Sequence, residues 1–427
     1  MNLNRISLVF TLFLITTGAF SQNSSSLAER FDRLQSIDNP GDKRFATNEA
    51  FNDLLNEIQL GNKPQIGANS ALQSLSPTDS SFTIYYQTTI FDAGDYQLDW
   101  VVSYKRTGQN KAYRFTEKIT NPIYKSIPKP QLIASLEKYQ LTDTLHNYYK
   151  LSFNDKSANQ SVFTFADVLL KAYFYELADL KSDDQKLALN NIIDTLLLPL
   201  FKASTQFNNR FEGLDKMGTI ISADEKVKVI TWNYVLENGD YHYFGYVIKN
   251  IDNAKVAVSK LTETIFNGNN ILNQSLNANH WFGNEYYQIV DGKDVKNNKF
   301  YTLIGGRTNG EFTKTKVVDI LWFAPNGDVR FGSPLFEMGK GSPRRLIYEY
   351  SFYSSMMMRY DTNHKMIVMD HLSPKSPEFR GNVTFNVPDF SYDALTFENG
   401  KWTLLSDIDL RNPSQSHSSR KPKSNKM

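Results

Sequence analysis

Acidic residues near the C-terminal end are the first candidates for chemistry. Asp370, Asp389 and Asp393 lie close together in the sequence, with His371 and Arg359 nearby. Two carboxylates on a rigid sheet can act as acid and base on a sugar if they lie about 5 to 10 Å apart and their pKa values differ. Aspartates in such sequences are also typical of turns, where they accept backbone N–H groups. The pattern therefore predicts either a catalytic pair or turn-capping aspartates, and it leaves open whether the chain is an enzyme.

Aromatic residues form the second group of candidates. A strand-like run begins at His280 and Trp281 and continues through Tyr286 and Tyr287. Other tryptophans occupy further expected strands, namely Trp232, Trp322 and Trp402. Exposed rings on a sheet face would stack on sugars, whereas buried rings would be core. The candidate ligand-binding residues are His280, Trp281, Arg359 and His371.

Several classes of site are excluded by composition. The chain contains no cysteine, which rules out disulfides, thiolate metal ligands and cysteine nucleophiles. Its six histidines are scattered without H-E-x-x-H or paired spacing. Neither a G-x-S-x-G elbow nor a P-loop occurs. We therefore expect no metal site and no cofactor.

The first 21 residues have the features of a secretory signal peptide. Arg5 precedes an apolar run, Ile6 to Phe20, and Ala19 and Ser21 provide small residues before a cut at Gln22. The alternative is a retained anchor helix. No later segment has the roughly 20 apolar residues that a membrane-spanning helix needs. We expect an exported protein, periplasmic or extracellular, with no transmembrane segment after cleavage.

Charge is unevenly distributed along the chain. The formal net charge is +2, but without residues 1–21 and 411–427 the body has 41 basic residues against 45 acidic ones. A mildly acidic body argues against nucleic acid as a partner. The basic segment 411–427 predicts a disordered tail, with contact to anionic surfaces as the alternative.

Turn signals and residue spacing predict an α+β fold. The hairpin signal is strongest at Val227 to Asn250, where β-branched and aromatic runs flank Asn238-Gly239. Successive strands joined by such turns are antiparallel, so we expect a large β-meander arranged as a sandwich, a barrel or a propeller-like form. Helical spacing is found mainly before it, at residues 27–34, 47–60, 129–139, 165–180 and 183–207, with one more helix near 256–266. Asn39-Pro40-Gly41 is expected to break the first helical stretch, and Pro199 to kink or end the last.

These elements suggest four regions. They are a signal peptide at 1–21, a helix-rich region with one β-hairpin unit at 22–221, an antiparallel β domain at 222–410 and the tail at 411–427. A hairpin signal at Phe82 to Tyr104 is similar to the one at Val227 to Asn250. A shift of 146 residues places Ile84 on Ile230, which predicts either an internal duplication or a chance match between similar hairpins.

Several sequence runs within about the last 200 residues resemble those of a known family. The runs that carry the resemblance include Tyr301–Gly305, Val317–Leu321, Phe331–Phe336, Ile347–Ser351, Ile367–Leu372 and Pro388–Asp393. They resemble a family of uncharacterised secreted β-rich proteins from Bacteroidota. The resemblance implies export and a β-rich domain, and no activity. A Trp and Asp in the family's turn after the first run are replaced here by Gly305 to Gly310.

Taken together, these features favour a non-enzymatic envelope or extracellular protein that binds a surface or a ligand. The ligand is unidentified, with glycans and envelope components as candidates. The alternative is a secreted hydrolase that acts on polysaccharide through paired carboxylates. A concave surface with accessible aromatic rings would favour the first function, and carboxylates converging in one cleft would favour the second.

Overall fold

The computed structural model describes residues 26–408, except 68–69, 93–94, 120–131, 142–146, 156–159, 166, 253, 267–268 and 340. The expected signal peptide and the basic tail lie outside the described residues. The chain forms two compact units: unit 1 runs to Leu136 and includes Phe153–Val162, and unit 2 comprises Glu137–Ser152 and the chain from Phe163 onward. The sequence-based border at residue 222 lies inside unit 2.

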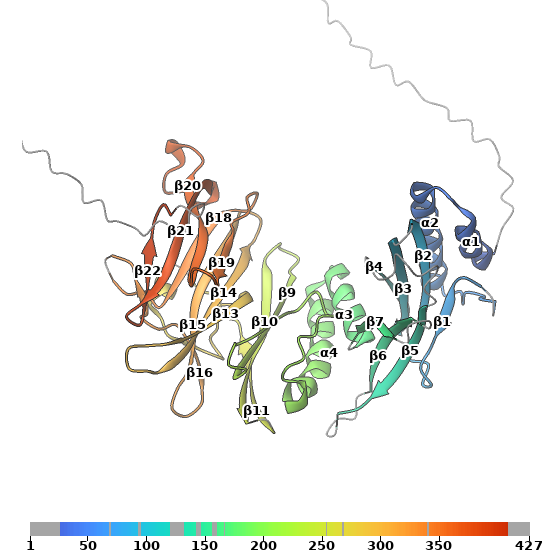
Figure 1. The fold of residues 1–427 in the computed structure, drawn as a ribbon, viewed down its shortest axis with the longest axis horizontal. Coiled ribbons are helices and arrows are strands. Elements are labelled where there is room, and N and C mark those ends of the chain that lie inside the picture. Colours follow the sequence, from blue (N-terminus) through green and yellow to red (C-terminus); the bar gives the residue numbers. More distant parts are fainter. Residues whose placement is uncertain are drawn as a thin grey trace, which may run out of the picture. The chain divides into compact units, whose positions relative to one another are not determined.

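The α+β fold class is confirmed. Most of the secondary structure is strand, four α-helices lie mainly in the N-terminal half, and several antiparallel sheets make up the C-terminal half (Figure 1). In the described part of the chain, no helix is long and apolar enough to cross a membrane.

Unit 1 contains two helices and a four-stranded antiparallel sheet of order β1-β2-β3-β4. The elements are α1 (Leu27–Arg33), the 3-10 turn η1 (Leu34–Ser36), α2 (Pro40–Gln59), β1 (Gln73–Leu75), β2 (Phe82–Asp92), β3 (Asp95–Arg106) and β4 (Gln109–Ile119). Helix α2 packs along one face of the sheet, where Phe51 and Leu54 meet Tyr85 and Val101 in a shared core (Figure 1).

Helix α2 begins earlier than expected. Asn39 caps it by accepting from the N–H groups of Gly41 and Asp42, and Pro40 occupies the first helical position. A proline at this position needs no N–H partner, and its fixed φ suits the helix. The expected break is present, because residues 37–39 are not helical, but the second helix starts at Pro40 and not at Thr47 as expected.

Two segments with helical spacing are strands. Leu132–Tyr139 forms β5, which joins β6 (Tyr148–Asp155) and β7 (Gln160–Phe165) in a sheet of order β5-β6-β7. Lys255–Thr262 forms β11, and its alternate residues Val256 and Val258 pack toward the helices of unit 2. The helices expected at 129–139 and 256–266 are thus corrected to strands over these bounds. A short apolar run is compatible with the spacing of a helix and with that of a strand, and pairing with neighbouring strands decides which of the two forms.

Unit 2 is built in layers. Its helices are α3 (Val168–Asp179) and α4 (Asp183–Lys202), and its first sheet has the order β11-β10-β9-β8, with β8 (Gly218–Ile221), β9 (Val227–Val235), β10 (Tyr241–Asp252) and β11. The helices cover one face of this sheet, where Trp232 and Tyr246 pack among Leu189, Ile193 and Leu197 (Figure 1). Helix α4 continues past Pro199 for one short stretch, to Lys202.

A six-stranded antiparallel sheet follows as the next layer. It contains β12 (Leu276–Asn277), β13 (Glu285–Lys293), β14 (Lys299–Asn309), β15 (Thr313–Phe323), β16 (Val329–Phe331) and β18 (Arg345–Ser351). The last layer has the order β17-β22-β21-β20-β19, with β17 (Phe336–Glu337), β19 (Met358–Asp361), β20 (Met366–Pro374), β21 (Asn386–Glu398) and β22 (Lys401–Leu405). Short 3-10 turns lie at Ser204–Gln206, Asn269–Asn273, Pro377–Phe379 and Val383–Phe385.

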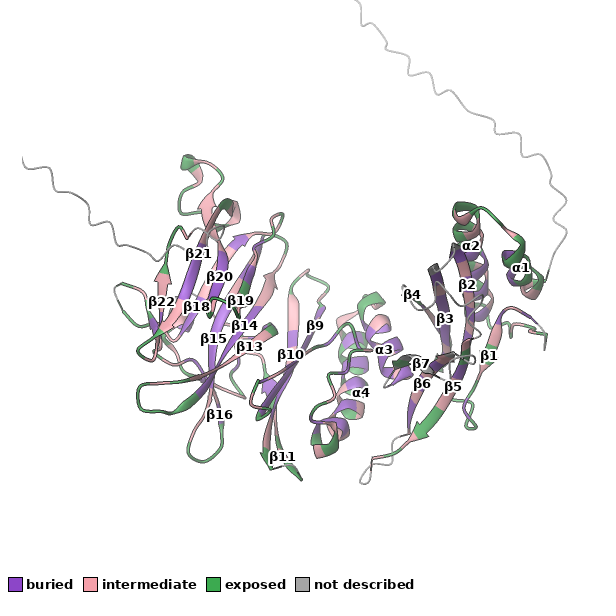
Figure 2. Ribbon diagram, viewed as in Figure 1, coloured by how far each residue is buried: buried purple, intermediate pink, exposed green. Residues whose placement is uncertain are grey.

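Both faces of the six-stranded sheet are buried. Leu303 and Leu321 pack with Val229 of the preceding sheet, whereas Ile304 and Ile320 pack in the core shared with the last sheet. Burial on both faces explains why β9, β14 and β15 contain nearly continuous apolar runs instead of alternation. Figure 2 shows the buried residues concentrated in the strands of these sheets.

The centre of the six-stranded sheet contains a buried ion pair. Arg345 Nε lies 3.1 Å from Asp319 Oδ2, and both side chains are fully buried. The guanidinium also donates to the carbonyls of Ile271 and Gln274, which ties the turn at 269–273 to the sheet. Burial raises the pKa of Asp319, and the charge of Arg345 opposes that rise. The pair therefore joins β15, β18 and a loop inside an apolar core.

The two units share an order of elements. Each has two helices followed by a four-stranded antiparallel meander, β1 to β4 or β8 to β11, with the helices on one face. Adding 146 to the bounds of β3 gives Tyr241–Asp252, which are the bounds of β10. This agreement in architecture and spacing supports the duplication over a chance match.

We expect Arg345→Met to destabilise unit 2 by about 3 to 5 kcal/mol, because it leaves the Asp319 carboxylate buried without a counter-charge. Urea unfolding followed by tryptophan fluorescence would measure the loss. Arg330→Met is the matched control, since Arg330 lies on the same sheet in an exposed pair with Asp328, and it should cost less than about 1 kcal/mol. The double change Arg345→Met with Asp319→Leu should recover most of the loss. Equal stability of Arg345→Met and the native protein would contradict this role.

Candidate functional site

The structure brings together three of the sequence-predicted residues on the last sheet. His371 of β20 lies between two aspartates of β21: its Nδ1 is 2.8 Å from Asp393 Oδ2, and its Nε2 is 4.0 Å from Asp389 Oδ2. Asp393 is largely buried and also accepts from the N–H of Asp407 at 3.2 Å. The hydrogen bond that His371 donates to Asp393 raises the pKa of His371; desolvation opposes the rise, and the charges of Asp393 and Asp389 add to it.

Asp370 and Arg359 are not part of this group. Asp370 Oδ2 accepts from the N–H of Met357 at 2.7 Å, which makes it a strand-to-strand contact. Neighbouring residues on a strand point to opposite faces, so Asp370 and His371 cannot share a surface. Arg359 is exposed on β19, where it stands opposite Val368. Of the expected cluster, only Asp389 and Asp393 converge, and an imidazole lies between them.

A bulge in β21 displays an exposed aromatic ring beside His371. Asp370 pairs with Tyr392 and Leu372 with Pro388, so His371 stands opposite three residues of the partner strand. The middle one, Phe390, is 95% exposed and has φ of 71°. Asp389 holds this bulge by accepting from the N–H and the hydroxyl of Ser391. The turn-capping role considered for Asp389 is therefore present, together with its approach to His371.

The expected aromatic binding face lies mostly in the core. Trp232, Trp281, Trp402 and Tyr286 are buried, and Trp281 donates through Nε1 to the Tyr286 hydroxyl at 3.2 Å. Trp281 therefore stabilises the core and does not reach a ligand surface, which corrects its place on the binding face. His280 is exposed and contacts Asn277 through Nδ1.

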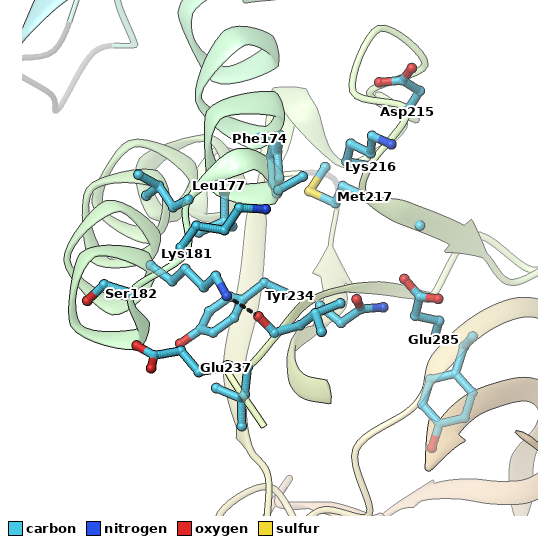
Figure 3. A pocket seen from close by; sticks show the side chains of 18 of the residues that line it. Phe174, Leu177, Lys181, Ser182, Asp215, Lys216, Met217, Tyr234, Glu237 and Glu285 are labelled. Atoms are coloured by element: carbon cyan, nitrogen blue, oxygen red, sulfur yellow. Dashed lines mark hydrogen bonds between the residues drawn. The ribbon is translucent and has the colours of Figure 1, made fainter. Parts of the chain in front are cut away.

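A cavity of about 1060 Å³ lies in unit 2 at the ends of α3, β9 and β13. Its walls include Phe174, Leu177, Met217 and Tyr234, which are apolar and buried, and Lys181, which is exposed. In the view of Figure 3, Tyr234 lies between Lys181 and Glu285. The cavity thus combines an apolar wall with charged groups that a ligand can reach.

Glu285 and Tyr287 are the polar and aromatic groups on the β13 side of this cavity. Glu285 is accessible from the cavity, yet surrounding protein raises its pKa by desolvation, while a hydrogen bond with Asn233 opposes the rise. Tyr287 is 39% exposed and donates its hydroxyl to the carbonyl of Met358 at 2.9 Å. Among the tyrosines of this run, Tyr287 is the one whose ring is accessible.

The lysine side chains of the cavity differ in the contacts that hold their amines. Lys186 is held in place, because its amine donates to the carbonyl of Val235 at 2.6 Å and lies 3.8 Å from Asp183 Oδ1. Lys216 lies over the ring of Tyr175. In the part of the chain that is described, no three His, Cys, Asp or Glu side chains are arranged to hold a metal ion.

Sequence reasoning missed most of this cavity. Its lining comes from segments between Phe174 and Tyr287, and helix packing brings them together. The available signal was local: Glu285-Tyr286-Tyr287 places a carboxylate and a ring on one face of a strand, with a core residue between them.

No protein-family model matches this chain, and no curated protein matches it.

We expect His371 to titrate with a pKa above the ordinary value of about 6.5, and Asp393→Asn to lower it. Because the folded pKa is raised, the stabilisation by His371 is fully present below the unfolded pKa and is lost as pH rises through the folded pKa. NMR titration of the ring protons, assigned with His371→Gln, and thermal melts across neutral pH would measure both effects. Asp389→Asn should give a smaller change, since Asp389 is farther from the ring. An unchanged midpoint in Asp393→Asn would refute the pairing.

Proposed function

We propose that this protein is an exported, non-enzymatic binding protein, and that the cavity beside Glu285 and Tyr287 is its ligand site. The observation that carries the proposal is the cavity itself, because about 1060 Å³ is large enough for a small molecule or a few sugar units. Its walls come from helices and strands of one unit, so the site is held by the core and not by a loop alone.

The chemistry of the lining favours binding over catalysis. The lining residues include neither histidine nor cysteine. Glu285 is an accessible carboxyl that can accept hydrogen bonds from a polar ligand, and burial raises its pKa. Such groups recognise a polar ligand without an acid–base pair.

Glycans and envelope components remain the candidate ligands. Accessible aromatic rings beside hydrogen-bonding groups suit sugars, whose faces are apolar and whose edges carry hydroxyls. Tyr287, Glu285 and Asn233 provide this combination on one side of the cavity. Export to the periplasm or outside the cell rests on the sequence pattern at residues 1–21, and N-terminal sequencing of the protein from the producing cell would test it.

The second candidate function is a hydrolase that acts on polysaccharide. It is favoured by the convergence of Asp389 and Asp393 on His371, next to the exposed ring of Phe390. A paired-carboxylate glycosidase needs its two acids to face a common space that holds the substrate. Here the imidazole occupies the space between them, so we rank this function second.

We expect Ala178→Trp to weaken ligand binding at least tenfold, because Ala178 lines the cavity from an exposed position on α3 and an indole would fill the space. Calorimetry against neutral oligosaccharides, acidic oligosaccharides and muropeptides would first identify a ligand of the native protein. Leu187→Trp, at an exposed site on α4 outside the lining, is the control and should bind normally. Binding that survives Ala178→Trp, or a native protein that binds nothing in the panel, would exclude the cavity as the site.

The hydrolase candidate makes a separate prediction. If it is correct, the native protein cleaves a member of a glycan panel and Asp389→Asn lowers the rate about 100-fold or more. Asp370→Asn is the matched control and should keep full activity, because Asp370 points to the other face. We expect no cleavage by the native protein, and measurable cleavage that depends on Asp389 would reverse the ranking.

A further inference from the structure

A small basic recess adjoins the proposed ligand cavity. It has a volume of about 190 Å³ and shares the lining residues Glu285 and Tyr287 with the larger cavity, so the two adjoin at these side chains. Its remaining walls come from β14, β15 and β18 and include Gly306, Arg307, Lys314 and Lys316. The recess is therefore an extension of the site at the end of the six-stranded sheet.

Strand register sets the position of Lys316. Glu285 pairs with Gly306 and Gly306 pairs with Lys316, so the three residues stand side by side on β13, β14 and β15. Gly306 has no side chain, and an added Cβ would lie 3.6 Å from Lys316 Cδ. The lysine chain thus lies across the glycine and places its amine 4.5 Å from the centre of the Tyr287 ring.

In the part of the chain that the structure describes, neither lysine of this recess is part of an ion pair, and the one carboxyl in its lining is that of Glu285. Within the described residues, no carboxylate oxygen lies within 4.0 Å of the Lys314 or Lys316 amine. Burial lowers the pKa of Lys316, and the like charge of Lys314 lowers it further. Arg307 is different, because Glu263 lies 3.5 Å from it and the carbonyl of Gly283 accepts from it.

We propose that the ligand carries an anionic oxygen-rich group, and that Lys314 and Lys316 bind this group in the recess while the rest of the ligand occupies the larger cavity. This inference rests on the proposed binding function and specifies its ligand class as an acidic glycan. A carboxylate of a uronic acid and a sulfate ester have the required chemistry in common, since both present several acceptors to ammonium donors. The volume of the recess suits one such group beside the Tyr287 ring.

A structural role is the competing explanation for these lysines. Lys316 lies over Tyr287 and Lys314 lies 4.6 Å from the centre of the Phe352 ring, and cation–π contacts of this kind stabilise a fold without any ligand. The same geometry occurs elsewhere on unit 2, where the Lys249 amine lies 4.4 Å from the centre of the Phe323 ring. Lys249 is outside both linings of the site and therefore offers a matched control.

The test compares three oligosaccharides of equal length by calorimetry: an oligogalacturonate, a sulfated galactan fragment and a neutral glucan. We expect at least one acidic ligand to bind more tightly than the neutral one, and its affinity to fall as salt is raised. Lys316→Gln and Lys314→Gln should each weaken the acidic ligand about tenfold and leave any binding of the neutral ligand unchanged. Lys316→Arg should retain most of the affinity, and Lys249→Gln should retain all of it. The preferred acidic ligand distinguishes carboxylate from sulfate.

Two failures are distinguishable. If neutral and acidic ligands bind equally and the lysine variants bind like the native protein, the anionic recess is refuted while the binding function stands. If none of the three ligands binds, the acidic-glycan inference is overturned, and the wider panel with Ala178→Trp decides the binding function. A loss of thermal stability in Lys316→Gln without a change in acidic-ligand affinity would assign the lysine a purely structural role.

Discussion

Burial of both faces of the six-stranded sheet is the constraint on which unit 2 depends. Side chains on β14 and β15 pack alternately against the sheet before them and the sheet after them, so an unpaired charge on either face is costly. Asp319 and Arg345 occupy the centre as a pair and use their hydrogen bonds to fix a loop. At Gly305 the same close packing excludes a side chain, since an added Cβ would lie 2.7 Å from the carbonyl oxygen of Glu285.

The candidate ligand site lies at the edge of the six-stranded sheet, where its two faces are no longer both buried. Glu285, Gly306 and Lys316 form the last polar row across three strands, beyond the apolar rows that contain Ile304 and Val318. A ligand can reach the charged groups at this edge, and the paired strands that carry these groups fix their backbone positions. A site built this way needs little reorganisation when a ligand binds, which favours recognition of a defined chemical group.

The sequence predicted the fold class well because turn signals and strand composition are local properties. It misplaced helices where short apolar runs fit both periods, as at Leu132–Tyr139, and it began the second helix at Thr47, although Asn39 and Pro40 start that helix seven residues earlier. The convergence of Asp389 and Asp393 on His371 was partly predictable, since these residues lie on sequential paired strands. The cavity was not, because packing of α3 and α4 on the sheet joins residues far apart in the chain. The alternation Thr313-Lys314-Thr315-Lys316 was the one local sign of a basic face on a strand.

Units 1 and 2 each contain a similar module of two helices and a four-stranded sheet. The helices pack on one face of each sheet, and the opposite face is also apolar and must be buried by other residues. In unit 1, Trp100 and Leu98 are buried on that face, and Phe153 packs on the neighbouring ring of Tyr86. In unit 2 the cover is the six-stranded sheet, which supplies Glu285 and both lysines of the recess. The basic recess therefore lies in the part of unit 2 that is not repeated, whereas the larger cavity also uses α3 and β9 of the repeated module.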